Sequence, residues 1–144
     1  MAAKLGAKKP WTVLVYLAGD NNLDQSGVAD LLEMKRVGST AGVNVVAEFD
    51  SASGRGAKRY VLRKGGPLAA DVVASLGRLD TGDPACLLDF IRWGVARCPA
   101  ERYALVLWNH GQGWDDTDVY ADERHRSLRR LATGRVRHAL FHAP

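Results

Sequence analysis

The sequence predicts an α/β fold: a three-layer sandwich in which helices cover both faces of a mainly parallel sheet. Three apolar runs, at residues 11–17, 43–49 and 103–108, are typical of strands that are covered on both faces. Two segments with apolar side chains at helical spacing lie between these runs. Strands that alternate with helices in this way favour a parallel sheet with right-handed crossovers.

The first apolar run leads into a turn and a helix. Trp11–Leu17 is rich in β-branched and aromatic residues, and the turn-forming stretch Ala18–Asn22 follows it. We expect Asp20 to cap a helix over Asp24–Val37, and Gly38 to end that helix. The apolar stripe of the helix should contain Val28, Leu31 and Leu32, with the stem of Lys35 as a further candidate.

Residues 43–63 predict a pair of strands. Val43–Phe49 is a second buried strand, and Arg59–Arg63 should form a more exposed one. The Ser/Gly-rich turn between them would join the two as a hairpin, which places an antiparallel strand at an edge of the sheet. Residues 68–82 fit either a short helix or an ordered loop.

A second helix should begin after Asp83, because a capping carboxylate followed by Pro84 is typical of a helix start. We expect it to end near Cys98, and Tyr103–Trp108 to form a third strongly buried strand. The apolar stripe of this helix should contain Leu87, Ile91, Gly94 and Val95, flanked by Leu88 and Phe90.

The chain of 144 residues suits one domain, and its apolar fraction of 47% is ordinary for a globular protein. The net charge of +4 is uneven, because residues 124–144 contain six arginines and no acidic residue. We therefore divide the chain into a basic extension at 1–10, an α/β domain at 11–123 and an arginine-rich segment at 124–144. Such a segment is usually a solvated helix or linker, so nucleic acid is not an expected partner.

Cysteine usage and hydropathy define the expected environment. Two cysteines do not make a disulfide framework in a chain of this size, and no Cys/His cluster resembles a zinc site. No apolar stretch is long enough to span a bilayer, and the first residues lack the pattern of a signal peptide. We expect a cytoplasmic chain without a membrane partner, and secretion of the parent protein remains compatible with these features.

Polar residues follow the predicted strands at their carboxyl ends, where open α/β sheets bind ligands. The most informative group is Asn109-His110-Gly111, because a histidine beside a glycine can act as a general base next to a backbone oxyanion donor. The alternative is a partly buried histidine that is bonded to a neighbouring loop. Position alone favours this second, structural interpretation of His110.

The surrounding motifs resemble those of clostripain-like cysteine peptidases, family C11. Residues 103–114 resemble the histidine segment of that family, and residues 11–23 resemble its start. A third match comprises Gly82-Asp83-Pro84, residues 87–90, and the link 99–103 into the histidine strand. Several separated motifs in the same order are more specific than one motif, and together they cover roughly residues 11–120.

The resemblance implies a caspase-like fold and a histidine/cysteine dyad that cleaves peptide or protein substrates after basic residues. His110 matches the catalytic histidine, and Gly111 matches the glycine after it. In the family the cysteine ends the next strand, but no cysteine follows His110 in this chain. We therefore expect an incomplete sheet and an N-terminal fragment that is inactive alone. The alternative is a non-catalytic remnant or pseudo-peptidase module.

Three further groups of residues are weaker candidates. Cys86 lies in a segment that superficially resembles the nucleophile motif, but it precedes His110 and begins a helix, so we expect it and Cys98 to be structural. The resemblance allows Ca²⁺ as a cofactor, although a solvated acidic loop is the favoured interpretation of residues 115–123. No other cofactor is expected, because Asp20, Asp50 and Asp80 have no phosphate-binding loop beside them.

Overall fold

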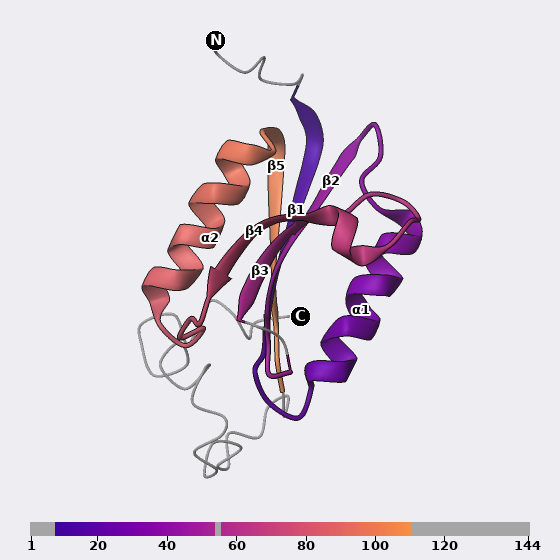
Figure 1. Ribbon diagram of the computed structural model, residues 1–144. Helices are drawn as coiled ribbons and strands as arrows, with labels where there is room; N and C mark the ends of the chain where they lie inside the picture. The colour runs from indigo at the N-terminus through magenta and orange to yellow at the C-terminus, as the bar shows by residue number, and fades with distance from the viewer. Residues whose placement is uncertain (1–7, 54–55, 111–144) are drawn as a thin grey trace.

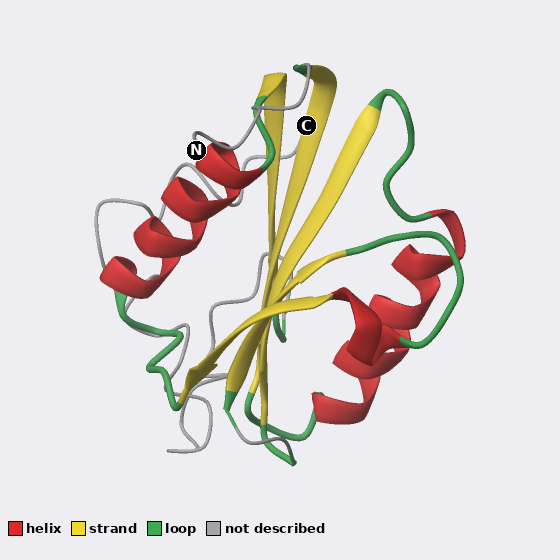
Figure 2. Ribbon diagram, turned by 45° about the horizontal axis from the view of Figure 1, so that its top comes forward, coloured by secondary structure: helices red, strands yellow, loops and turns green. Residues whose placement is uncertain are grey.

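A computed structural model describes residues 8–53 and 56–110 of the chain. Helix α1 (Asp24–Val37) packs on one face of a five-stranded sheet and helix α2 (Pro84–Arg97) packs on the other, as Figures 1 and 2 show. The predicted three-layer α/β sandwich is therefore confirmed.

The sheet is mixed, with its parallel strands at the centre and on one side. Strand β1 pairs in parallel with both β2 and β5, whereas β3 is antiparallel to both β2 and β4. Parallel pairing is thus less dominant than the sequence predicted. The order across the sheet is β4-β3-β2-β1-β5, and the strands are β1 (Lys9–Gly19), β2 (Val43–Ser51), β3 (Ala57–Val61), β4 (Val72–Gly77) and β5 (Ala100–Trp108).

Two apolar cores lie on opposite faces of the sheet, because successive side chains of a strand point to opposite faces. On one face, alternate residues of β1, β2 and β3 pack around Leu31 of α1. On the other face, the remaining alternate residues of β1 and β2 pack around Phe90 of α2. Both helices thus stabilise the same central pair of strands.

Helix α1 has the predicted bounds, and Gly38 ends it with φ of 63° while donating its N–H to Met34 O at 2.8 Å. A Cβ at Gly38 would lie 2.3 Å from the Lys64 nitrogen, so both the backbone conformation and the space require glycine. The predicted cap is wrong, because no side chain caps this helix. The predicted stripe is half correct: Leu31 and Lys35 are buried, whereas Val28 and Leu32 are exposed.

Helix α2 begins as predicted, since the Asp83 carboxylate accepts from the Ala85 N–H at 2.9 Å and Pro84 stands in the first turn. The predicted stripe is partly correct: Gly94 is buried and Leu87 packs against the core, but the stripe centres on Phe90, which was expected to flank it. Val95 is exposed instead. Apolar residues occur almost all round this helix, so its spacing alone did not indicate which side meets the sheet.

From the sequence, residues 68–82 fitted either a short helix or an ordered loop. The structure has a short 3-10 helix (η1, Leu68–Asp71) and strand β4 in this segment. The antiparallel pairing of β2 with β3 confirms the predicted hairpin, but β4 pairs with β3 and forms the edge in its place. The burial of β4 alternates between half-buried and exposed, which is typical of an edge strand and leaves a weak signal in the sequence.

Strand β5 differs most from its prediction. The sequence predicted strong burial, but Tyr103, Leu105 and Val106 are 39%, 39% and 43% exposed. Among the described residues β5 has only β1 as a neighbour, so its outer edge and parts of both faces are uncovered. The expectation of an incomplete sheet stays a prediction, because residues 111–144 lie outside the described part of the chain.

Candidate active site

His110 lies two residues after the end of β5, beside the loop between β1 and α1. The two strands are parallel, with Leu17 paired to Trp108, so the chain leaves both strands at the same edge of the sheet. There the His110 ring meets Asn22, with 2.7 Å between His110 Nε2 and Asn22 Oδ1. The structure thus brings together two polar motifs that the sequence analysis treated separately.

Neighbouring asparagines connect the two backbones at this edge. Asn21 Nδ2 donates to Ala18 O at 3.1 Å and to Asn109 Oδ1 at 3.4 Å. Asn109 Oδ1 also accepts the backbone N–H of His110 at 2.6 Å. Asn21 Oδ1 accepts the N–H of Leu23 at 2.8 Å, which makes the turn at the start of α1. From the sequence, Asn21 and Asn22 were turn residues at a polar strand end, with no role of their own.

Close packing fixes the start of α1 against β2. A Cβ on Gly19 or Gly27 would lie 2.4 or 2.5 Å from Phe49 Cε2, so the ring occupies the space that only glycine leaves. Asp24, in the first turn of α1, accepts from Ser51 Oγ at 2.6 Å and from the Ala52 N–H at 3.1 Å. These contacts join the loop after β2 to the helix that follows the asparagine turn.

A buried carboxyl stands at the end of β2. Asp50 is 4% exposed, and burial together with the charges of Asp20 and Glu48 raises its pKa to about 7. Burial is also the main cause that raises the pKa of Asp20, and the charge of Asp80 adds to it. Desolvation disfavours the charged form of a carboxyl, so the ionised form of the buried Asp50 is held at a cost in stability. Among the described residues, no group of three or more histidine, cysteine, aspartate or glutamate side chains could hold a metal ion.

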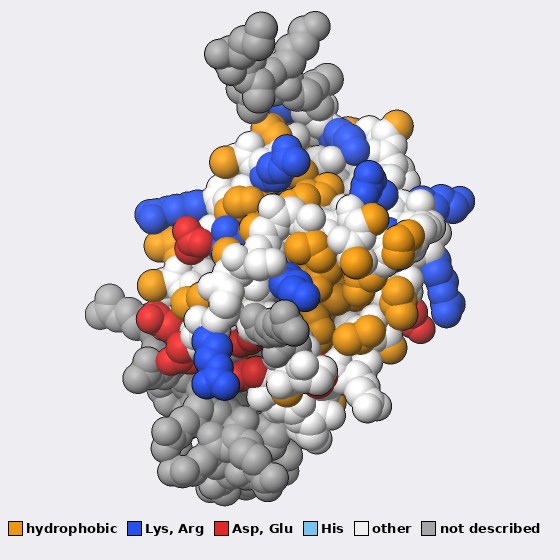
Figure 3. Space-filling model, in the orientation of Figure 1, with side chains coloured by type: hydrophobic (Ala, Val, Ile, Leu, Met, Phe, Trp, Pro, Cys, Tyr) orange, Lys and Arg blue, Asp and Glu red, His pale blue; other side chains and the backbone are white. Residues whose placement is uncertain are grey.

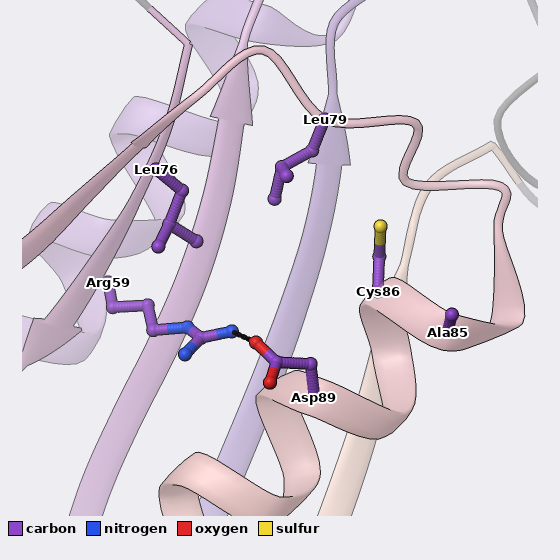
Figure 4. A pocket seen from close by; sticks show the side chains of 6 residues that line it. All are labelled: Arg59, Leu76, Leu79, Ala85, Cys86 and Asp89. Carbon is purple, nitrogen blue, oxygen red and sulfur yellow. Dashed lines mark hydrogen bonds and ion pairs between the residues drawn. The ribbon is translucent and has the colours of Figure 1, made fainter.

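Cys86 lines a different feature, a pocket of about 310 Å³ between β4 and α2. Figure 4 shows its side chain on the first turn of α2, near Leu79, while Arg59 reaches across to Asp89. Arg59 Nη2 lies 2.6 Å from Asp89 Oδ2, and Arg59 Nε lies 2.7 Å from the buried Glu48 Oε2. The six residues that line this pocket do not include His110.

The surroundings of Cys86 oppose thiolate formation. Burial raises the pKa of its thiol, and the charges of Asp83, Glu48 and Asp80 raise it further. Figure 3 shows acidic side chains gathered near the start of α2. A nucleophilic cysteine needs the opposite environment, with cations that lower its pKa. Cys98 is buried in the core beside α2. Both environments favour structural cysteines, as expected from the sequence.

Several candidates lie outside the described residues. Gly111 and the acidic residues 115–123 belong to this group, and so does the arginine-rich segment at 124–144. Their predicted roles, as an oxyanion donor, a solvated acidic loop and a solvated helix or linker, stay predictions. The described helices include none that is long and apolar enough to cross a membrane.

Three solved structures to which this chain is similar are cysteine proteases. A cysteine protease from B. fragilis has 26% identity and a TM-score of 0.60, and the match covers 78% of this chain and 98% of that one. An inactive zymogen C11 protease from Parabacteroides distasonis has 26% identity and a TM-score of 0.64, covering 78% and 34%. A secreted C11 protease from Bacteroides thetaiotaomicron, solved with an irreversible peptide inhibitor, has 30% identity and a TM-score of 0.59, covering 73% and 30%.

The fold and the matched structures therefore define the class as caspase-like cysteine peptidases. The model of the clostripain family, Peptidase C11, matches residues 15–140. The chain belongs to the clostripain family. It spans about a third of the length of two of the three relatives above. No curated protein sequence matches it.

Proposed function

We propose that this chain supplies the catalytic histidine of a clostripain-like cysteine endopeptidase, with His110 as the general base and Gly111 as a backbone oxyanion donor. The observation that supports this role best is the place of His110 at the carboxyl end of β5, beside the loop that follows β1. Catalytic groups of open α/β sheets gather at such ends.

The nucleophile in this proposal is a cysteine at the end of a further strand that pairs with β5. Two observations support such a strand. The outer edge of β5 has no partner among the described residues. Leu105 and Val106 point to opposite faces of the sheet, and both are about 40% exposed. A further strand beside β5, together with the elements that pack on its two faces, would bury these side chains. The thiol would give its proton to the imidazole and attack the scissile carbonyl.

The proposed substrates are peptides or proteins cleaved after Arg or Lys. Family membership supports this choice. Two related structures were solved with peptide inhibitors, which is consistent with a peptide substrate for the family. The cytoplasmic location expected from the sequence stays a prediction, and one relative is described as secreted.

The test begins with the coding DNA beyond Pro144. A following strand that ends in Asp-Ala-Cys would support the proposal, whereas a stop codon would favour the non-catalytic remnant. The 144-residue chain and the complete protein would then be assayed with fluorogenic peptides that end in Arg, Lys or Glu. We expect no turnover by the chain alone, and turnover of the Arg and Lys peptides by the complete protein.

Variants of the complete protein separate the roles. His110→Gln should lower kcat by at least about a hundredfold, since general acid–base catalysis contributes that much. Gln25→Ala, at an exposed position of α1, should leave kcat unchanged. Turnover by the 144-residue chain that disappears in Cys86→Ser would overturn the proposed position of the nucleophile. Full activity of His110→Gln would overturn the proposal itself.

A further inference from the structure

The His110 ring has a specific partner that the sequence did not indicate. Its Nε2 atom lies 2.7 Å from Asn22 Oδ1, across 88 residues of sequence. We propose that Asn22 is the positioning residue for His110: its amide oxygen holds the Nε2 side of the ring and leaves Nδ1 as the atom that accepts a proton. The inference deepens the proposed function and rests on it, because it assigns a partner to the catalytic histidine.

The chemistry of the amide determines the tautomer. An amide oxygen can only accept, so the Nε2 atom that it meets must carry the hydrogen. The neutral ring is then the Nε2–H tautomer, and its lone pair is on Nδ1. The hydrogen bond that the other ring nitrogen makes is the usual way in which a protein selects one tautomer.

The same hydrogen bond serves both states of the ring. When a cysteine thiol gives its proton to Nδ1, the S–H bond breaks and a thiolate and an imidazolium form. The Nε2–H group is unchanged by this transfer and still donates to Asn22 Oδ1. The ring therefore keeps its orientation before and after the proton moves, and returning the proton to a leaving amine needs no rotation.

Asn22 is held in place by the residue before it. Asn21 Nδ2 donates to Ala18 O, and Asn21 Oδ1 accepts the N–H of Leu23, so the turn on both sides of Asn22 is fixed. Asn21 O accepts the N–H of Asp24 at 3.2 Å, which joins the turn to α1. Asn21 thus shapes the backbone, while Asn22 presents its side chain to the ring.

The exposure of Asn22 makes the role testable. Asn22 is exposed and His110 is half-buried, so the hydrogen bond between them contributes little to folding. A substitution at Asn22 should change the tautomer or the titration midpoint of the His110 ring without unfolding the chain. This contrasts with Asn44, which is buried and donates to Thr12 Oγ1 at 3.0 Å.

The experiment measures the ring nitrogens of His110 by NMR in the ¹⁵N-labelled 144-residue chain. The wild type is compared with Asn22→Ala, Asn22→Asp and the control Gln25→Ala, and His110→Gln identifies the signals among the four histidines. We expect a neutral ring with hydrogen on Nε2 in the wild type and the control. In Asn22→Ala the ratio of Nε2–H to Nδ1–H tautomers should fall about two- to tenfold.

The Asn22→Asp variant gives a second, independent readout. A carboxylate beside Nε2 favours the charged ring, so the midpoint of the His110 titration should move about one pH unit or more toward higher pH. A wild-type ring with hydrogen on Nδ1 would overturn the proposal. Unchanged tautomer and unchanged midpoint in both Asn22 variants would overturn it as well.

Activity of the complete protein separates this inference from the proposed function. If both hold, Asn22→Ala lowers kcat with little change in KM, and Asn22→Asp moves the acid limb of the pH profile. If His110→Gln abolishes turnover while Asn22→Ala leaves kcat and the ring tautomer unchanged, only the positioning role is wrong. If the Asn22 variants change the ring but turnover does not depend on His110, the proposed function is wrong.

Discussion

Strands β1 and β5 lie side by side, run in the same direction and have similar apolar compositions, yet their environments differ. Leu14 of β1 is 2% exposed, while its direct partner on β5, Leu105, is 39% exposed on the same face. β1 has strand neighbours on both sides and helices on both faces. The comparison teaches that burial depends on the number of neighbouring elements and not on the apolar character of the strand alone.

The largest expected effect tests this difference directly. Leu14→Ala should lower the free energy of unfolding by about 2–5 kcal/mol, because it leaves a cavity between β1 and α2. Leu105→Ala removes the same atoms from a half-covered position and should cost about 1 kcal/mol. Urea unfolding followed by circular dichroism measures both. Equal losses would contradict the different burial of the two strands.

A second substitution examines why β1 is covered by α2. A Cβ on Gly94 would lie 2.4 Å from Leu14 Cδ2, so Gly94→Ala should lower the free energy of unfolding by about 1–3 kcal/mol through overpacking. The change should be smaller in a Leu14→Ala background, where the side chain that clashes is absent. Strictly additive losses in the double variant would show that the contact is not the cause.

The buried end of the central strands gives a pH-dependent effect. Asp50 pairs in register with Ala18 of β1, and its pKa of about 7 lies above the value of an unfolded aspartate. The folded chain therefore binds more protons between about pH 4 and 7, and this carboxyl lowers the free energy of unfolding as the pH rises through that range.

Asp50→Asn removes that ionisation. The variant should gain up to about 4 kcal/mol at pH 8 relative to the wild type, and close to nothing at pH 4. Glu33→Gln, an exposed carboxylate on α1, serves as the control and should show no such trend. Urea titrations at the two pH values measure the free energy of unfolding of each variant. A gain of equal size at both pH values would show that the ionisation of Asp50 is not the cause.

The smallest effect is expected where β5 ends. His110→Gln should change the free energy of unfolding by less than about 0.5 kcal/mol, because its ring is half-buried and lies beyond the last strand residue. A thermal melt of the 144-residue chain checks this expectation. A loss of several degrees would indicate that His110 contributes to the fold, which is the structural interpretation of this residue.

Local signals in the sequence predicted much of the fold. The bounds of α1, its end at Gly38 and the Asp83-Pro84 start of α2 depend on neighbouring residues and were predicted correctly. Strand β4 was missed, because an edge strand with short alternating burial has little apolar content to mark it. The buried side of α2 was predicted only in part, with Gly94 buried as expected and Val95 exposed, because a helix with apolar residues almost all round does not indicate its own orientation.

For the candidate site too, the sequence predicted some residues and missed others. His110 and its glycine were found from the sequence, because several ordered motifs surround them, and family membership is confirmed by the match over residues 15–140. The partner of the ring was not found, since Asn22 precedes His110 by 88 residues. The Asp20 cap was wrong because Asn21 makes the turn at the start of α1 instead.

The sequence by itself determined the two helices, the strands other than β4, the class of fold and the family, because each depends on short patterns of residues along the chain. Only the tertiary structure decided the exposure of β5, the burial of Asp50 and the contact between Asn22 and His110. These features depend on which strands become neighbours. In a parallel sheet, residues far apart in sequence meet at one edge because their strands run side by side in register.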